Sequence, residues 1–165
     1  MVDNYTNNVV SNLIHEVGHV PGKKALQKWV YMLQECEGME LGLSFRMYHY
    51  GPYSVELESI VDDLEAGNAI SLSHGDTIQI ESKMSSREVT LPEVRRVIGL
   101  FGELKPWELE LMASLHFLAR RKPYSGTDSD KDLIKRKLKA WKGTKFSDYE
   151  VAKALAQLEE AEYLP

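Results

Sequence analysis

Apolar residues recur along most of this chain at the spacing of amphipathic helices. Residues 6–17 place branched apolar side chains on one stripe at about 100° per residue, as in a surface helix: Val9, Val10, Leu13, Ile14 and Val17. Residues 22–36 and 54–66 each repeat an i, i+3, i+4, i+7 pattern, which also predicts helices. Glycine follows each of these three segments and ends it.

Two segments have the pattern of strands instead. Residues 43–50 are rich in aromatic residues and partly alternate, which favours a strand that ends at Gly51-Pro52. Residues 69–81 contain two alternating runs around His74-Gly75-Asp76, which predicts a hairpin. We expect the strand at 43–50 to pair with the hairpin at 69–82. A helix, a strand, a further helix and a hairpin follow the order of a winged helix, a fold that binds more often than it catalyses.

The second half of the chain predicts helices only. Residues 92–103 and 130–141 have amphipathic patterns, and residues 106–119 are apolar nearly all round, so we expect the latter to be a central buried helix. Ser147 and Glu150 fit a capping box that opens a last helix. The polar residues 83–88 predict a link between the halves. The fold class is therefore mostly α (α+β), with a winged-helix-like unit at 1–84 and a helical unit at 90–165 packed against it.

Charge is distributed unevenly along the chain. The formal net charge is −5, but residues 1–90 carry 6 Lys/Arg and 13 Asp/Glu, whereas residues 91–145 carry 13 and 7. Such asymmetry can mark a surface for nucleic acid or for an acidic partner. It is equally compatible with a homo-oligomer in which unlike patches meet.

Composition excludes several classes of protein. The sequence contains no run of about 18 apolar residues, so we expect no membrane span. The first residues lack the basic start and apolar stretch of a signal peptide, which predicts a cytoplasmic protein. Cys36 is the only cysteine, so an intrachain disulfide and a multi-cysteine metal site are both excluded. Its position in an apolar helix predicts a packed thiol.

One motif resembles a zinc site. His15-Glu16-Val17-Gly18-His19 matches the H-E-x-x-H pattern, in which two histidines on one helix bind the metal. Gly18 lies inside the motif and Pro21 follows closely, so the helix cannot continue around a metal. We therefore predict no metal site here.

No constellation of residues supports catalysis. His49, His74 and His116 are scattered, and the pattern around His116 predicts a hydrogen-bonded core histidine. No nucleophile with a nearby base can be proposed, and no glycine loop could hold a phosphate. We predict no enzymatic activity, no catalytic residue and no cofactor.

Aromatic residues flank Gly51-Pro52, and an acidic helix follows them. Aromatic density at a turn is typical of a binding hot spot, although the same residues could fill the core beneath the turn. The helix 54–66 carries five acidic residues and no Lys or Arg, which opposes contact with DNA phosphates. We therefore predict a protein partner. The predicted contacts are Tyr48, His49, Tyr50, Tyr53, Glu56 and Asp63.

The helix at 130–142 supplies the alternative. Its lysines cluster within about 80° of one another, with an arginine beside them, while Leu133, Ile134, Leu138 and Trp141 are predicted on the opposite face. This basic face is either a solvated surface or the contact for an anionic partner, and nucleic acid is the alternative partner. The residues are Lys131, Lys135, Arg136, Lys139 and Lys142.

Three parts of the chain resemble a known family. Residues 24–34, residues 45–54 with the following Asp62-Asp63-Leu64 and Gly67, and residues 107–118 are similar to the YwgA-type uncharacterised bacterial and archaeal proteins. The Gly51-Pro52 turn and its surroundings also resemble the Panacea (SocA-like) antitoxin domain. The resemblance implies a helical domain with a small wing, no known catalysis, and an adaptor or toxin-neutralising role.

Overall fold

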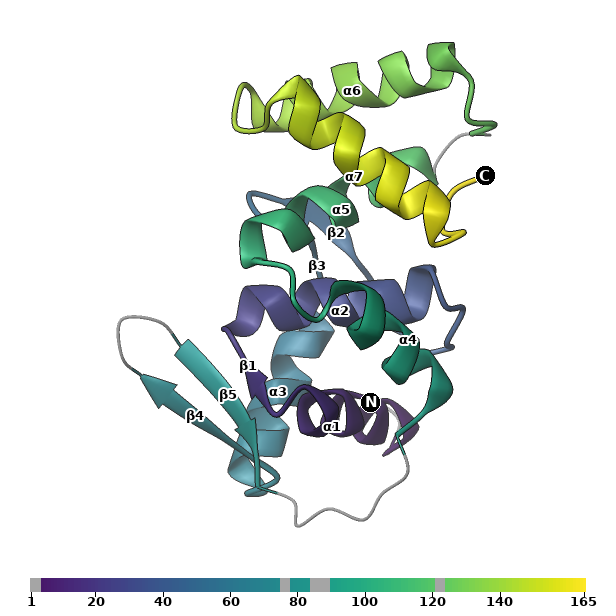
Figure 1. Ribbon diagram of the computed structural model, residues 1–165. Coiled ribbons are helices and arrows are strands. Elements are labelled where there is room, and N and C mark those ends of the chain that lie inside the picture. Colours follow the sequence, from purple (N-terminus) through teal and green to yellow (C-terminus); the bar gives the residue numbers. More distant parts are fainter. Residues whose placement is uncertain (1–3, 75–77, 84–89, 121–123) are drawn as a thin grey trace.

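The computed structural model describes residues 4–74, 78–83, 90–120 and 124–165. These residues form seven helices and five short strands (Figure 1), which confirms the mostly α (α+β) fold class. The first part contains α1 (Asn4–Val17), β1 (His19–Val20), α2 (Lys23–Glu35), β2 (Arg46–Tyr48), β3 (Gly51–Tyr53), α3 (Val55–Ala66), β4 (Ile70–His74) and β5 (Ile78–Ser82). The second contains α4 (Pro92–Phe101), α5 (Pro106–Ala119), α6 (Asp128–Lys142) and α7 (Asp148–Glu160).

A three-stranded antiparallel sheet of order β1-β5-β4 completes the winged-helix arrangement. The hairpin β4–β5 pairs Leu72 with Ile80, and Val20 of β1 pairs with Ile80 from the other side. Val20, Ile70 and Ile80 are buried, so this sheet covers one side of the core with its apolar residues. The centre of the expected hairpin turn, residues 75–77, and residues 84–88 of the expected link lie outside the described residues.

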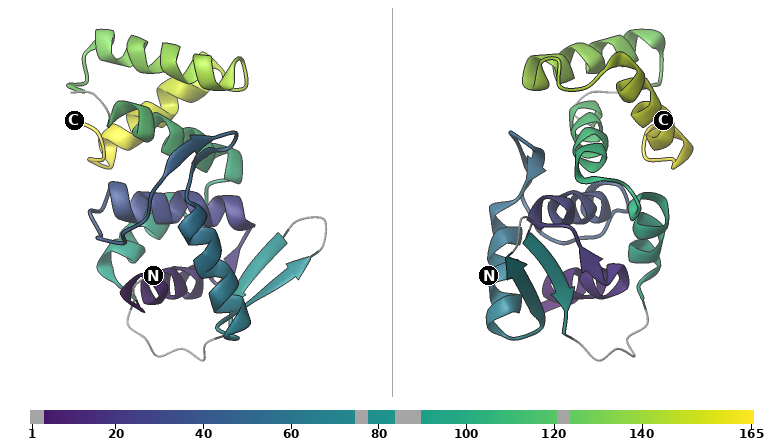
Figure 2. Two further views of the ribbon diagram at one scale, coloured as in Figure 1. Left: turned by 180° about the vertical axis from the view of Figure 1, so that it is seen from behind. Right: turned by 60° about the vertical axis from the view of Figure 1, so that its left-hand side comes forward.

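The pairing expected for residues 43–50 was wrong. Strand β2 does not join the wing; it pairs with β3 in a hairpin of its own, in the register Arg46 with Tyr53 and Tyr48 with Gly51. The strand that joins the wing is β1, a two-residue segment too short to show an alternating pattern. The hairpin β2–β3 therefore lies between the second and third helices of the winged helix, and Figure 2 shows it on the opposite side of α2 from the wing.

One continuous cluster of buried apolar residues runs through both parts of the chain. Helix α5 is buried from Leu109 to Ala119, as its apolar sequence predicted, and packs on α2, β3, α6 and α7. Helix α4 packs on α1 and α2, where the indole of buried Trp29 donates to the carbonyl of Phe101 at 3.2 Å. Helices α6 and α7 form the end of the molecule farthest from α1 (Figure 1). The division at residues 84–90 into two units stays a prediction.

Several local expectations are confirmed. Ser147 accepts from the N–H of Glu150, whose side chain accepts from the N–H of Ser147, so α7 begins with the predicted capping box. Buried His116 shares a hydrogen bond of 2.8 Å between its Nδ1 and the hydroxyl of Tyr31, as expected for a core histidine. Burial raises the pKa of the Cys36 thiol, as Glu35 and Glu37 also do, which fits a packed thiol. No helix in the described ranges is long and apolar enough to span a bilayer.

Candidate functional site

The hairpin β2–β3 ends in a tight turn that rests on the central helix. Because Tyr48 pairs with Gly51, only His49 and Tyr50 form the connection. Gly51 has φ +91°, a conformation that residues with a Cβ rarely adopt. A Cβ at this position would lie 2.8 Å from Oγ of Ser114 on α5. Glycine is therefore required both by the backbone conformation and by the close approach to α5.

Two lysines from different helices hold the backbone of this turn. Lys28 of α2 donates from Nζ to the carbonyl of Pro52 at 2.9 Å. Lys142, the last residue of α6, donates to the carbonyl of His49. Two residues after Pro52, the backbone of Ser54 is held by Gln27, whose side chain accepts from the Ser54 N–H at 2.8 Å and donates to the Ser54 carbonyl at 2.9 Å. The turn is thus fixed from both parts of the chain.

A buried carboxylate lies at the centre of these contacts. The Glu110 side chain is 5% exposed, and its Oε1 lies 2.8 Å from Nζ of Lys142, which is 3% exposed. Lys145 donates to both carboxylate oxygens, at 2.9 and 2.8 Å. Buried charges are tolerated when they are paired and hydrogen-bonded, and removal of one partner is strongly destabilising. We call Lys24, Lys28, Glu110, Lys142 and Lys145 the lysine–glutamate cluster.

Burial lowers the pKa of Lys28 from 10.5 to about 7. Glu110 opposes this shift, whereas the positive charges of Lys142 and Lys24 add to it. The largest cause is the loss of hydration, because transfer of an ammonium group out of water disfavours its charged form. Lys28 therefore changes its charge near neutral pH, which an ordinary lysine does not.

The aromatic side chains of the turn are presented to solvent. Tyr48 is 45% exposed and Tyr50 is 48% exposed, and His49 between them is also exposed. The Tyr48 ring meets the Tyr53 ring edge-on at 5.6 Å, and the Nζ of Lys24 lies 3.3 Å from the centre of the Tyr50 ring. Of the two readings left open by the sequence, exposure of these side chains agrees with a surface and not with core filling.

The acidic helix α3 begins beside this turn. The Glu56 carboxylate binds groups near the start of α3: it accepts from the N–H of Ser44 at 3.2 Å and from the hydroxyl of Ser54. Glu58 accepts from the Tyr53 hydroxyl at 2.7 Å, and burial together with this contact raises the pKa of Tyr53 to about 12. Asp63 is exposed about two turns further along α3. Of the six predicted contacts, the structure thus brings five together and places Asp63 apart.

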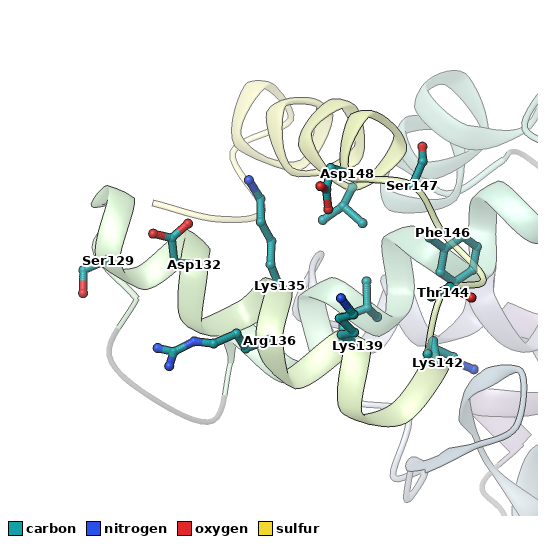
Figure 3. A pocket seen from close by; sticks show the side chains of 13 residues that line it. Ser129, Asp132, Lys135, Arg136, Lys139, Lys142, Thr144, Phe146, Ser147 and Asp148 are labelled. Carbon is teal, nitrogen blue, oxygen red and sulfur yellow. The ribbon is translucent and has the colours of Figure 1, made fainter.

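The five predicted basic residues of α6 do not form one free surface. Lys142 is buried at Glu110, and Lys131 lies 3.3 Å from the carboxylate of Glu159 on α7. The remaining three, Lys135, Arg136 and Lys139, line a groove of about 720 Å³ between α6 and the start of α7. Figure 3 shows Lys135 reaching toward α7 while Arg136 extends in a different direction.

One residue of the apolar face predicted for α6 is exposed. Ile134 and Leu138 are buried as expected, but Trp141 is 57% exposed. It lies in the last turn of α6, next to Lys142, whose side chain is buried at Glu110. In this turn the side chain that packs against α5 is therefore a lysine and not the tryptophan of the apolar face.

The two histidines of the H-E-x-x-H motif lie in different elements. His15 belongs to the end of α1, and after Gly18, with φ +80°, His19 belongs to β1. Nδ1 of His19 lies 3.0 Å from the carboxylate of Glu81 on the paired strand. Within the described ranges, no group of three His, Cys, Asp or Glu residues is placed to hold a metal ion.

Sequence reasoning did not identify Lys28, Glu110 or Lys145. The available signal was the carboxylate of Glu110 within the part of α5 that is apolar nearly all round, because buried acidic residues are rare unless they are paired. Its partners could not be read from the sequence, since Lys142 and Lys145 lie more than thirty residues away.

Comparisons with known proteins give no match, either to the models of known protein families or among curated proteins. The resemblance to the YwgA-type family stays a prediction, and function has to be argued from the site itself.

Proposed function

We propose that this chain is a non-catalytic regulatory or adaptor module that binds a protein partner in the cytoplasm through the β2–β3 turn. The observation that carries the proposal is the pair of half-exposed tyrosines on a turn whose carbonyls are held by Lys28 and Lys142. Exposed aromatic residues supply much of the binding energy in protein interfaces. A turn fixed before binding loses little conformational entropy when the partner arrives, which favours affinity.

The charge beside the turn indicates the kind of partner. Helix α3 exposes Glu58, Asp62, Asp63 and Glu65, with no basic residue on the helix to balance them. A partner with a basic rim around an apolar pocket would complement this surface, and complementary charge mainly raises the association rate and the specificity. The resemblance to antitoxin-like domains that the sequence predicts implies a toxin-neutralising or adaptor role of this type.

A comparison of matched variants tests the turn as the interface. Proteins captured from a native extract are compared for wild type, Tyr48→Ala/Tyr50→Ala, and the control Tyr149→Ala, whose ring is even more exposed but lies on α7. We expect a partner that is captured by wild type and by the control and is lost with the double variant. With the purified partner, the double variant should weaken affinity about tenfold or more. Identical partner sets for all three folded proteins would exclude the turn as the interface.

Duplex DNA binding is the second candidate, and the α6–α7 groove is the observation that favours it. Lys135, Arg136 and Lys139 lack an ion-pair partner within the described residues, so they are available to phosphates. A DNA-binding regulator would show affinity that falls linearly with salt on logarithmic axes. Binding that persists at physiological salt and is lost in Lys135→Ala/Lys139→Ala would favour DNA over a protein partner. Binding only at very low salt would be non-specific attraction.

A further inference from the structure

A small pocket of about 210 Å³ lies beside Tyr50, where the first turns of α2 and α5 meet. Its chemistry comes from three lysines, one carboxylate and two partly exposed aromatic rings: Lys24, Lys28, Lys145, Glu110, Tyr50 and Trp107. The pocket thus combines a strongly cationic wall with aromatic sides. The proposed protein interface uses Tyr50 as a contact and Lys28 only as a support of the turn backbone, whereas Lys24, Lys145, Glu110 and Trp107 have no part in it.

The positive charge of this pocket is not balanced from within. Both carboxylate oxygens of Glu110 already accept from Lys145, and Oε1 also accepts from Lys142, which does not line the pocket. In the part of the chain that the structure describes, Lys28 donates to the uncharged carbonyl of Pro52, and Lys24 lies over the Tyr50 ring. With all three lining lysines protonated, the pocket carries a net charge of +2, which matches a dianion.

The helix backbone adds to the positive electrostatic potential in the pocket. Helix α2 begins at Lys23 and α5 begins at Pro106, so Lys24, Pro106 and Trp107 place the first turns of both helices in the pocket wall. The start of a helix carries a partial positive charge and favours a nearby anion. The start of α2, which has no side-chain cap and no acidic residue in its first turn, therefore acts in the same direction as the three ammonium groups. At the start of α5, the Glu108 carboxylate already accepts from the N–H of Lys105.

We propose that this pocket binds the phosphate group of a small ligand, held by Lys24, Lys28 and Lys145, with Tyr50 and Trp107 beside the group to which the phosphate is attached. Lysines suit this role because each offers a compact charge and three donors to a tetrahedral oxyanion. The pocket is too small for a large ligand, so it would take a free phosphate or the phosphate end of a small ester.

Binding at this site should be coupled to a proton. Burial has lowered the pKa of Lys28 to about 7, and the charged groups that face it are Glu110, Lys24 and Lys142. A dianion next to Lys28 would stabilise the ammonium form. Since Lys28 is mostly charged at pH 6 and mostly neutral at pH 8, affinity for an anion of constant charge should fall about tenfold between these values.

Calorimetric and NMR titrations test the proposal with defined probes. Sulfate supplies a tetrahedral dianion that does not titrate between pH 6 and 8, and phosphate and phenyl phosphate show whether an attached ring adds affinity. Chloride keeps the ionic strength constant. We expect saturable sulfate binding that is about tenfold tighter at pH 6 than at pH 8 in wild type. Phenyl phosphate bound more tightly than phosphate would identify an ester as the ligand, and equal affinities would identify free phosphate.

Variants assign the effect to the pocket. Lys145→Gln, at a side chain that is 40% exposed, should weaken sulfate binding about fivefold or more, whereas Lys153→Gln on α7 should not. Lys28→Met should remove the pH dependence along with most of the affinity. His49→Gln, at the exposed histidine of the turn, is the second control, and the pH dependence of sulfate binding should survive in it.

Two results would overturn the phosphate site: no saturable binding of any probe at pH 6, or binding that Lys145→Gln and Lys28→Met leave unchanged. This test is independent of the protein partner. Lys145→Gln should retain the partner that Tyr48→Ala/Tyr50→Ala loses, so failure of either proposal can be told from failure of the other.

Discussion

Lys142 and Glu110 form a buried ion pair with 2.8 Å between Nζ and Oε1, although they lie on different helices. The same ammonium donates to the carbonyl of His49 in the aromatic turn. One side chain at the end of α6 therefore connects the carboxylate of the central helix to the proposed binding surface. The candidate site depends on this contact between the C-terminal helices and the winged-helix part.

Replacement of the buried Lys142 should cost more stability than replacement of an exposed lysine on the same helix. We expect Lys142→Met to lower the free energy of unfolding by about 2 kcal/mol or more, because the buried Glu110 carboxylate loses one of its two ammonium partners and the His49 carbonyl loses a donor. Lys139→Met on the same helix should change stability by less than about 0.5 kcal/mol. Urea unfolding of the three proteins measures the difference. Equal midpoints for both variants would show that the pair contributes no net stability.

Gly51 and Gly99 form a second matched pair. Gly51→Ala should destabilise the protein by about 2 kcal/mol or more, since it combines a positive φ with an approach of 2.8 Å to Ser114. Gly99→Ala, in the middle of α4 with no heavy atom near its added Cβ, should stabilise the protein by up to about 1 kcal/mol.

A double variant isolates the steric part of the Gly51 effect. Oγ of Ser114 has no hydrogen-bond partner within the described residues, so Ser114→Ala removes the close atom without loss of a bond. Thermal unfolding should show a smaller cost of Gly51→Ala in the Ser114→Ala background. An unchanged cost would assign the whole effect to backbone conformation.

Lys28 should make stability increase with pH above neutrality. Its pKa is about 7 in the folded protein and 10.5 in the unfolded chain, so between these values the unfolded chain binds more protons. The penalty is complete below about pH 7 and decreases as pH rises, with a slope of at most about 1.4 kcal/mol per pH unit. Chemical unfolding from pH 6 to 8.5 should show this slope in wild type and in Lys153→Met, but not in Lys28→Met. A wild-type slope equal to that of Lys28→Met would contradict the assignment.

His116 should lower the stability of the folded protein as the pH falls below about 6.5. Burial lowers its pKa to about 4 from 6.5, with Arg120 acting in the same direction. The unfolded chain therefore binds a proton between these values that the folded protein does not, so stability is lost as pH falls from about 6.5 to 4, by about 3 kcal/mol in total. The difference in unfolding free energy between wild type and His116→Gln should change across this range. For the control Val55→Ala, at an exposed residue that carries no ionisable group, the difference should stay nearly constant.

Most helices of this protein could be predicted because their signals are local. In the stripe of Val9, Leu13 and Val17, and in the capping box of Ser147 and Glu150, each residue is at most four positions from the next, and this spacing has the same geometry in any helix. The exposed tyrosines of the turn could also be singled out, because Gly51-Pro52 restricts the backbone locally. The sequence could not decide whether the rings of these tyrosines face solvent or fill the core.

What the sequence by itself determined is the order of the helices, the mostly α class and a break in the chain direction beside Gly51, since each follows from short-range backbone preferences and side-chain periodicity. Only the tertiary structure decided that β1 and not β2 completes the wing, that Lys142 leaves the basic face of α6, and that Lys28 and Lys145 gather with it around Glu110. Lys28, Lys142 and Lys145 each lie at least 32 positions from Glu110 in the sequence, and the β1–β5 partners lie 60 or 62 positions apart. They are set by how α2, α5 and α6 pack together, because buried charges select their partners by proximity in the folded chain and not by spacing along it.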